Sequence, residues 1–325
     1  MKNEISSKTI DSYVNNNNKT NINLSKFYSF GINNMSIPEE VTESETEINI
    51  ISNLKKLIKK NYILAPVTQT CGIKIYTPDK EELIIQLKFP NNIGVNSFLL
   101  NSAYCNMNKV LYITGGINEN EKTNISLSVD LNRKDQIILL NPMKLRRSGH
   151  TMISYDNKYL LAVGGEDTAS VERYNIIDNI WELVSPMNYK RIYPILAIHN
   201  NYLYALFGKS NNNEYCNTIE RISLSNIEHA KWEIVQFLNP HNIDTRIYGC
   251  AVHIIDNYLY LFGGKCNEKT TNQIITYNFD KNLLSKEEST FNVKNSFKEN
   301  KLYEIDGKLI QISEDKNLGF CIELA

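Results

Sequence analysis

The residues that could carry catalytic or metal chemistry in this chain are its five histidines and six cysteines. His150 and His253 fall in apolar runs typical of strands, and His199 falls in a turn. None of the three has a serine, cysteine or aspartate at a spacing that predicts a catalytic triad. The histidines also do not cluster with the cysteines at the spacing of metal ligands. We therefore predict that the protein is not an enzyme and holds no metal or other cofactor.

Three arginines offer a different chemistry, because each stands just before an apolar run. They lie in the segments Arg146-Arg147-Ser148-Gly149, Lys190-Arg191-Ile192-Tyr193 and Thr245-Arg246-Ile247-Tyr248-Gly249. Arginine presents a planar fork of N–H donors that matches a carboxylate, and Arg and Tyr are frequent anchors in protein interfaces. Two interpretations stay open. The arginines contact a partner, or they only bond to a neighbouring loop of the same molecule.

Composition places the chain among ordinary soluble proteins, with 42% hydrophobic and 22% charged residues and a net charge of −1. Such a balance favours neither nucleic acid nor a membrane surface as a partner. No apolar run approaches the roughly 18 residues of a transmembrane helix, and the first residues lack the apolar core of a signal peptide. The six cysteines could form three disulfides, but without a secretory signal we predict reduced thiols and a cytoplasmic location.

The elements that position these residues belong to a repeated strand pattern, which is clearest between Arg146 and Met187. There, one strand runs into Gly164-Gly165, the next ends at Tyr174, and a third contains Trp181. Parts of this pattern recur at Gly115, Gly116, Gly208, Trp232, Gly263, Gly264 and Tyr277. Successive first glycines are 44 to 55 residues apart, close to the period of propeller-forming repeats. The glycines permit positive φ, and the Tyr and Trp side chains fill space between neighbouring units, so we interpret all of these residues as structural.

The order of diglycine, tyrosine and tryptophan resembles the kelch repeat over roughly residues 61–325. The resemblance implies an all-β fold, a kelch-type β-propeller of commonly six blades, in which the last blade lacks an outer strand. Outside the resemblance, the polar composition of 1–46 predicts a largely disordered, low-complexity tail, and the apolar periodicity of 47–60 predicts a short amphipathic helix or linker before the propeller at 61–325. In BTB-containing kelch proteins the propeller often starts partway through a blade, and here no BTB domain is recognisable.

Two departures from the pattern affect the expected blades. The fourth repeat has Gly208-Lys209 in place of a diglycine, and the first repeat has no diglycine at all. In that first repeat, Tyr76 and Leu83 reproduce the spacing of Tyr174 and Trp181. On that alignment the first blade lacks its inner strand. The helix at 47–60 could then be a remnant of an upstream region, or the N-terminal tail could donate a strand.

The resemblance also implies a function. In similar kelch proteins, residues at the start of the inner strands ring the central mouth and contact ligand peptides, often acidic ones. By that resemblance we expect a basic, aromatic rim formed by Arg147, Arg191, Tyr193, Arg246 and Tyr248, which would bind a protein partner without catalysis. Two alternatives remain. One is a substrate receptor or adaptor in cullin-type ubiquitin ligation, partnered by a cullin or a BTB protein, or a truncated competitor of such proteins. The other is a kelch-like enzyme such as an oxidase or a sugar isomerase.

Overall fold

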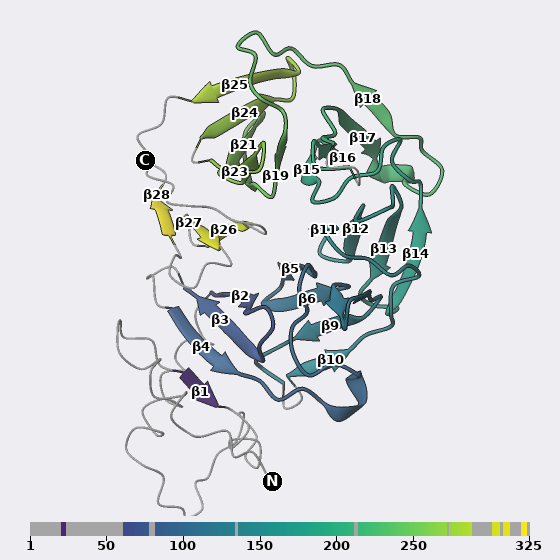
Figure 1. Ribbon diagram of the computed structural model, residues 1–325, viewed down its shortest axis with the longest axis vertical. Coiled ribbons are helices and arrows are strands. Elements are labelled where there is room, and N and C mark those ends of the chain that lie inside the picture. Colours follow the sequence, from purple (N-terminus) through teal and green to yellow (C-terminus); the bar gives the residue numbers. More distant parts are fainter. Residues whose placement is uncertain are drawn as a thin grey trace, which may run out of the picture.

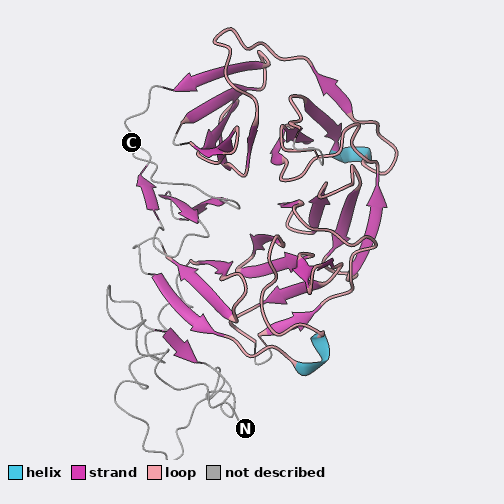
Figure 2. Cartoon of the chain, in the orientation of Figure 1, coloured by secondary structure: helices cyan, strands magenta, loops and turns pink. Residues whose placement is uncertain are grey.

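The computed structural model describes residues 21–23, 61–77, 82–133, 136–210, 214–271, 273–287, 301–305, 308–312 and 320–323. The helix expected at 47–60 lies outside these residues, and so does the expected N-terminal tail apart from 21–23. The described part consists of strands, loops and two single 3-10 turns, η4 (Asn91–Ile93) and η5 (Leu224–Asn226), as Figure 2 shows. It contains no helix that is long and apolar enough to cross a membrane.

The strands form small sheets that stand side by side around a common centre (Figure 1). The first sheet contains β2 (Ile63–Pro66), β3 (Gly72–Tyr76), β4 (Glu82–Gln86) and β1 (Asn21–Asn23). The second contains β5 (Ala103–Met107), β6 (Val110–Thr114), β9 (Ser126–Val129) and β10 (Ile137–Leu139). The third contains β11 (Thr151–Tyr155), β12 (Tyr159–Val163), β13 (Val171–Asn175) and β14 (Ile180–Val184).

The remaining sheets continue the ring. The fourth contains β15 (Ile195–His199), β16 (Tyr202–Leu206), β17 (Ile219–Ser223) and β18 (Glu233–Val235). The fifth contains β20 (Ala251–Ile255), β21 (Tyr258–Phe262), β24 (Ile274–Asn278) and β25 (Leu283–Glu287). The sixth has three described strands, β26 (Lys301–Ile305), β27 (Lys308–Ile312) and β28 (Phe320–Glu323). Short ribbons in the connecting loops are formed by β7 (Ile117–Asn118), β8 (Glu121–Lys122), β19 (Ile247–Tyr248), β22 (Lys265–Cys266) and β23 (Lys269–Thr270).

The first strand of each sheet lies nearest the centre, where β5, β11, β15, β20 and β26 each pack against the next. Successive strands step outward to the rim, so the sheets are arranged as the blades of a β-propeller (Figure 1). The first five sheets bury apolar faces against their neighbours, and such sheets must stack to make a core. The expected all-β, propeller-type fold is confirmed, and the number of blades stays a prediction.

The two faces of the ring differ in their connections. Because the strands of one sheet alternate in direction, the loop that leads into an inner strand emerges on the same side as the loop joining the second and third strands. We call this side the loop face. The short turns after the first and third strands lie on the opposite side, which we call the turn face.

Strand register corrects the alignment of the fourth repeat. Thr151 pairs with Val163, and Ile195 pairs with Leu206, so Phe207 occupies the place of Gly164. Gly208 then corresponds to the second glycine, with φ of +101° against +115° at Gly165. The altered diglycine is therefore Phe207-Gly208 rather than Gly208-Lys209. Phe207 adopts φ of +52°, a left-handed conformation that costs an L-residue about 1–2 kcal/mol.

The first sheet also differs from its expected alignment. Its order is β1-β4-β3-β2, and β2 packs against β5 and β6 near the centre. Tyr76 therefore lies in the second strand, not the third, and the expected absence of an inner strand is wrong. The spacing from Tyr76 to Leu83 does not distinguish the second and third strands from the third and fourth, because consecutive antiparallel strands with short turns give similar spacings anywhere in a sheet. The outermost place is taken by β1, which pairs with β4 in parallel, as expected if the N-terminal tail donates a strand.

Candidate functional site

Arg147 lies in the loop from β10 into β11, on the loop face, but its side chain turns inward and is 0% exposed. Its Nη1 donates to the carbonyls of Gly164 and Ser170 at 2.7 and 2.9 Å. Its Nη2 donates to Ser170 Oγ at 2.7 Å and to Glu172 Oε1 at 3.1 Å, and its Nε donates to the same Glu172 oxygen. All five guanidinium N–H groups thus find acceptors inside the third sheet.

Arg191 repeats this arrangement in the fourth sheet and is also 0% exposed. Nη1 donates to the carbonyls of Phe207 and Thr218 at 2.8 and 3.0 Å. Nη2 donates to Thr218 Oγ1 at 2.7 Å and to Glu220 Oε1 at 2.8 Å. The two arginines therefore bind equivalent atoms in successive sheets, which identifies the arrangement as a repeated structural unit.

Burial lowers the pKa of Arg147, and the adjacent Glu172 carboxylate opposes that shift. Both carboxylates also accept backbone N–H groups from the loop that carries the arginine: Lys144 and Leu145 donate to Glu172, and Asn188 and Tyr189 donate to Glu220. The expectation that Arg147 and Arg191 line an accessible rim is corrected. These guanidinium groups are fully used in holding their own loops against the sheet.

Arg246 does not share this position. The residue four places before β20, as Arg147 is before β11, is Ile247, and Ile247 is 1% exposed. Arg246 is one residue earlier, 45% exposed, and forms a bidentate pair with Asp244 at 2.9 and 2.7 Å. Hydrogen bonding to Arg246 lowers the pKa of Asp244 to about 2.

The two predicted tyrosines meet at the central mouth. Their rings are stacked with centroids 6.0 Å apart. The hydroxyl of Tyr193, from the loop into the fourth sheet, donates to Asn101 Oδ1 at 2.8 Å in the loop into the second sheet. Tyr248 is buried, and its hydroxyl donates to Glu268 at 2.9 Å. Tyr193 thus connects the loops that lead into the second and fourth sheets, and its ring packs against the ring of Tyr248.

Glu268 collects several donors beside this tyrosine pair. Its carboxylate accepts from Lys209 Nζ at 2.7 Å and from the hydroxyls of Tyr215 and Tyr248 at 2.8 and 2.9 Å. These interactions, that with Lys209 being the largest, lower the pKa of Glu268 to about 2. Desolvation, followed by the Glu268 carboxylate, raises the pKa of Tyr215 to about 12. The cluster links the loops of the fourth and fifth sheets.

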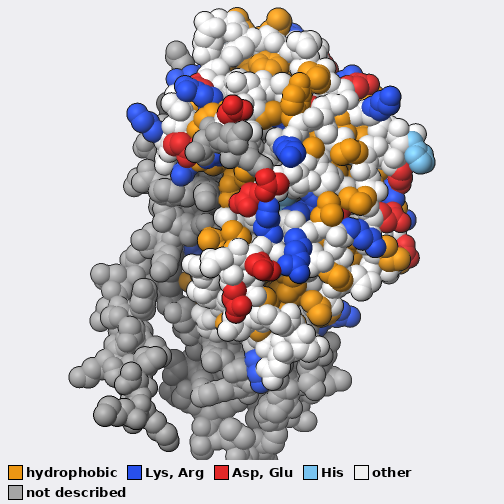
Figure 3. Space-filling view, turned by 45° about the vertical axis from the view of Figure 1, so that its right-hand side comes forward, with side chains coloured by type: hydrophobic (Ala, Val, Ile, Leu, Met, Phe, Trp, Pro, Cys, Tyr) orange, Lys and Arg blue, Asp and Glu red, His pale blue; other side chains and the backbone are white. Residues whose placement is uncertain are grey.

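Sequence reasoning missed the side chains that these loops do expose. Leu145 and Tyr189 stand two residues before Arg147 and Arg191, and they are 37% and 43% exposed. The exposed residues flanking them on the loop face include Lys144, Arg146 and Lys190. Cationic, acidic and hydrophobic side chains are interspersed over the surface in Figure 3, and no large patch of one sign dominates that view. The signal in the sequence was the identical offset of Leu145 and Tyr189 from an arginine.

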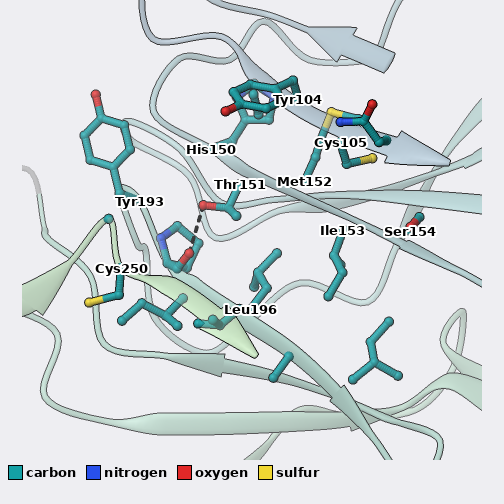
Figure 4. Close-up of a pocket in the computed structure, with 18 of the residues that line it drawn as sticks. Tyr104, Cys105, His150, Thr151, Met152, Ile153, Ser154, Tyr193, Leu196 and Cys250 are labelled. Carbon is teal, nitrogen blue, oxygen red and sulfur yellow. Dashed lines mark hydrogen bonds between the residues drawn. The ribbon is translucent and has the colours of Figure 1, made fainter. Parts of the chain in front are cut away.

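A cavity of about 390 Å³ lies along the inner strands of the second to fifth sheets. It is bounded by 102–106, 150–154, 193–198, 249–250 and 252–254 (Figure 4). Of the side chains lining it, Thr151 donates to the Pro194 carbonyl at 2.8 Å, and Ser102 donates to the Leu99 carbonyl at 2.9 Å. No Asp, Glu, Lys or Arg is among the described lining residues.

The histidines and cysteines have mainly packing environments. His150 is buried, with Nε2 2.8 Å from Thr114 Oγ1, and the ring of His199 stacks on Phe279 at 4.1 Å between centroids. His253 lies on β20 and lines the cavity. The described part of the chain contains no group of three or more His, Cys, Asp and Glu residues able to hold a metal. In the described part, Cys71, Cys105, Cys216, Cys250 and Cys266 are not joined in disulfide bonds.

Comparison with known proteins agrees with this architecture. No family model matches the chain. Kelch-like protein 26 of Danio rerio is 25% identical over 158 residues, which cover 47% of this chain and 25% of that protein. Kelch-like protein 15 of Homo sapiens and of Mus musculus is 24% identical over 130 residues, covering 37% of this chain and 20% of those proteins. The chain is thus similar to kelch-like proteins, as the repeats indicate, and the matches span a quarter or less of the length of these relatives.

Proposed function

We propose that this protein is a non-enzymatic interaction module that holds a protein partner on its loop face. The observation that carries the proposal is the pair of exposed apolar side chains Leu145 and Tyr189, at equivalent places in successive loops. Each loop is fixed by two backbone N–H bonds to a buried carboxylate that is itself held by a buried arginine. A fixed loop loses little conformational entropy when a partner binds, so exposed side chains on it are suited to recognition.

The charges beside these two side chains suggest the partner's chemistry. Lys144, Arg146 and Lys190 are exposed next to them, and Arg146 is held by Glu121 at 3.0 Å in a pair that is open to solvent. A partner segment with an apolar residue flanked by carboxylates would bury Leu145 and Tyr189 while approaching the cations. We therefore place an acidic segment on these two loops, with Arg246 and Tyr193 as contacts nearer the mouth.

The cavity lining supports a role without catalysis. An isomerase that moves protons with carboxylates would need them in the mouth, and the described lining contains none. The buried Glu172 and Glu220 carboxylates are each occupied by an arginine and two backbone N–H groups. Neither is available to move a proton for a substrate.

The test begins with affinity purification of the full chain, followed by binding measurements on each protein recovered. The variant Leu145→Glu/Tyr189→Glu should weaken a true partner at least tenfold, because it removes both apolar contacts and repels carboxylates. The control is Ile177→Glu, a 77% exposed residue on the turn face, which should leave affinity unchanged. If the native chain, the double variant and the control variant bound every recovered partner with equal affinity, this site would be refuted.

A second candidate function rests on the similarity to kelch-like proteins. We infer that the propeller could serve as a substrate receptor or adaptor in cullin-type ubiquitin ligation, through a cullin or a BTB protein, or as a truncated competitor of such receptors. The cheap test is co-purification of the full chain with cullins and BTB proteins from the same cells. Recovery of partners on the loop face without any cullin or BTB protein would leave the simple interaction module as the better account.

A further inference from the structure

The central cavity is a candidate ligand site separate from the loop face. Its volume of about 390 Å³ falls within the ~300–1,000 Å³ typical of small-molecule sites. Four inner strands form its walls, and β5, β11, β15 and β20 each stand at the end of their sheet's strand order. The cavity is therefore framed mainly by the inner strands, and by residues just before them such as Tyr193 and Cys250 at one end.

The side chains on the walls are mostly apolar. Ile153, Ile198, Val252 and Ile254 line the cavity and are only half-buried. Ile198 and Ile254 are each the fourth residue of a five-residue inner strand, on the side of the turn face. At the other end, Ala103, His150 and Ile195 are buried, and Tyr193 lies beside them with its ring directed away from the space between the strands (Figure 4). The apolar surface is therefore more accessible toward the turn face than toward the Tyr193 crossing.

The described lining contains no Asp, Glu, Lys or Arg, and His150 and His253 are the only described lining residues that can carry a positive charge. Moving an unpaired carboxylate or ammonium group into such a space is unfavourable. Hydroxyl groups at Thr151 and Ser102 already donate their hydrogens to protein carbonyls, so each can only accept a further hydrogen bond. A neutral ligand with one O–H group satisfies both conditions.

We propose that this cavity binds a neutral, mainly apolar molecule that carries a hydroxyl donor. The apolar body lies against Ile153, Val252 and Ile254, and the hydroxyl group donates to Thr151 Oγ1. No charged residue of the loop face takes part, so the proposal does not depend on the proposed protein partner.

The experiment titrates the full chain with 2-naphthol and, in parallel, with 2-naphthoate, which has the same ring system but a negative charge. Intrinsic ligand fluorescence reports binding. We expect saturable binding of one 2-naphthol per chain and at least tenfold weaker binding of 2-naphthoate. Absence of saturable binding, or equal affinity for both probes, would overturn the proposal.

Two variants locate the site. Val252→Phe adds volume to the cavity wall and should lower the affinity for 2-naphthol at least tenfold. The control is Ile177→Phe, in the exposed turn between β13 and β14, which should leave that affinity unchanged. If Val252→Phe does not fold, Thr151→Val serves instead, and loss of one hydrogen bond should weaken binding roughly three- to tenfold. Unchanged affinity in whichever of these two variants folds would place the probe elsewhere and refute the assignment.

Discussion

The fourth and fifth sheets have different side chains at the place where the loop into the inner strand meets the third strand. In the fourth, the loop into the inner strand is held by the buried pair Arg191–Glu220. In the fifth, register places Ile247 where Arg191 stands and Ile275 where Glu220 stands, and both isoleucines are buried, at 1% and 4% exposure. The backbone course is retained in both, so the ion pair is not required for the sheet to form.

The two solutions differ in how they hold the loop. Glu220 accepts the N–H groups of Asn188 and Tyr189, which an isoleucine cannot do. In the fifth sheet, Asp244 instead accepts the N–H of Arg246 at 3.0 Å, a local turn made within the loop itself. The ion pair thus fixes the loop to the sheet, whereas the apolar pair only fills the core.

The largest effect should come from removing one partner of the buried pair. Glu220→Ala leaves the Arg191 guanidinium buried without its counter-charge and frees two loop N–H groups. Loss of one partner of a buried ion pair costs about 3–5 kcal/mol, so we expect the free energy of unfolding to fall by about that amount in denaturant titration. A loss below about 1 kcal/mol would contradict the expectation that the buried Arg191 guanidinium needs the Glu220 carboxylate as its counter-charge.

Next in size is the effect of a side chain at the first glycine. In Gly164→Ala the new Cβ would lie 2.4 Å from the Arg191 carbonyl oxygen, and φ is +69°. The left-handed conformation alone costs about 1–2 kcal/mol, and the contact adds to it, so we expect a loss of about 2–3 kcal/mol. Thermal unfolding measures it, and Gly94→Ala, with φ of +76° and nothing within 4 Å of the new Cβ, is the matched control that carries only the conformational cost.

Copying the fifth sheet into the fourth should have a smaller effect than breaking the pair. Arg191→Ile/Glu220→Ile removes both charges together, and such replacements are often neutral or stabilising. We expect the double variant to recover most of the stability lost in Glu220→Ala, measured by the same denaturant titration. Affinity for the partner on the loop face should still fall, because Tyr189 loses its anchor. A double variant as unstable as the single one would show that the apolar solution depends on its own surroundings.

The smallest effect concerns the exposed carboxylates of the fifth sheet. Glu268 has its pKa lowered from 4.5 to about 2, so it stabilises the fold above pH 4.5, and that contribution is lost as pH falls through about 2. Because its side chain is 53% exposed, solvent screening holds the contribution to at most about 1 kcal/mol. Between pH 5 and pH 2, the free energy of unfolding should decline less steeply for Glu268→Gln than for the native chain. Identical slopes would remove Glu268 from the acid response.

The sequence allowed the propeller to be predicted because its signals are local. Glycine pairs, turns and the Tyr174 and Trp181 positions each report on a few neighbouring residues. The direction of Arg147 depends instead on Glu172, 25 residues later and on a different strand. A clue was present, since the two repeats with an arginine four residues before the inner strand also have a Glu in the third strand. The offset of Leu145 from Arg147 can be read in the sequence, but that Arg147 is the buried residue of the two follows from this contact.

A row of main-chain bonds runs from sheet to sheet beneath these varied side chains. The N–H groups of Gly116, Gly165 and Gly208 donate to the carbonyls of Arg147, Arg191 and Ile247 at 2.9, 2.8 and 3.1 Å. Each acceptor is a carbonyl that every amino acid possesses, so the seam between adjacent blades places no demand on the identity of the residue that supplies it. Individual repeats are thereby free to diverge in sequence, and a new binding specificity can be built on one blade without loosening the next.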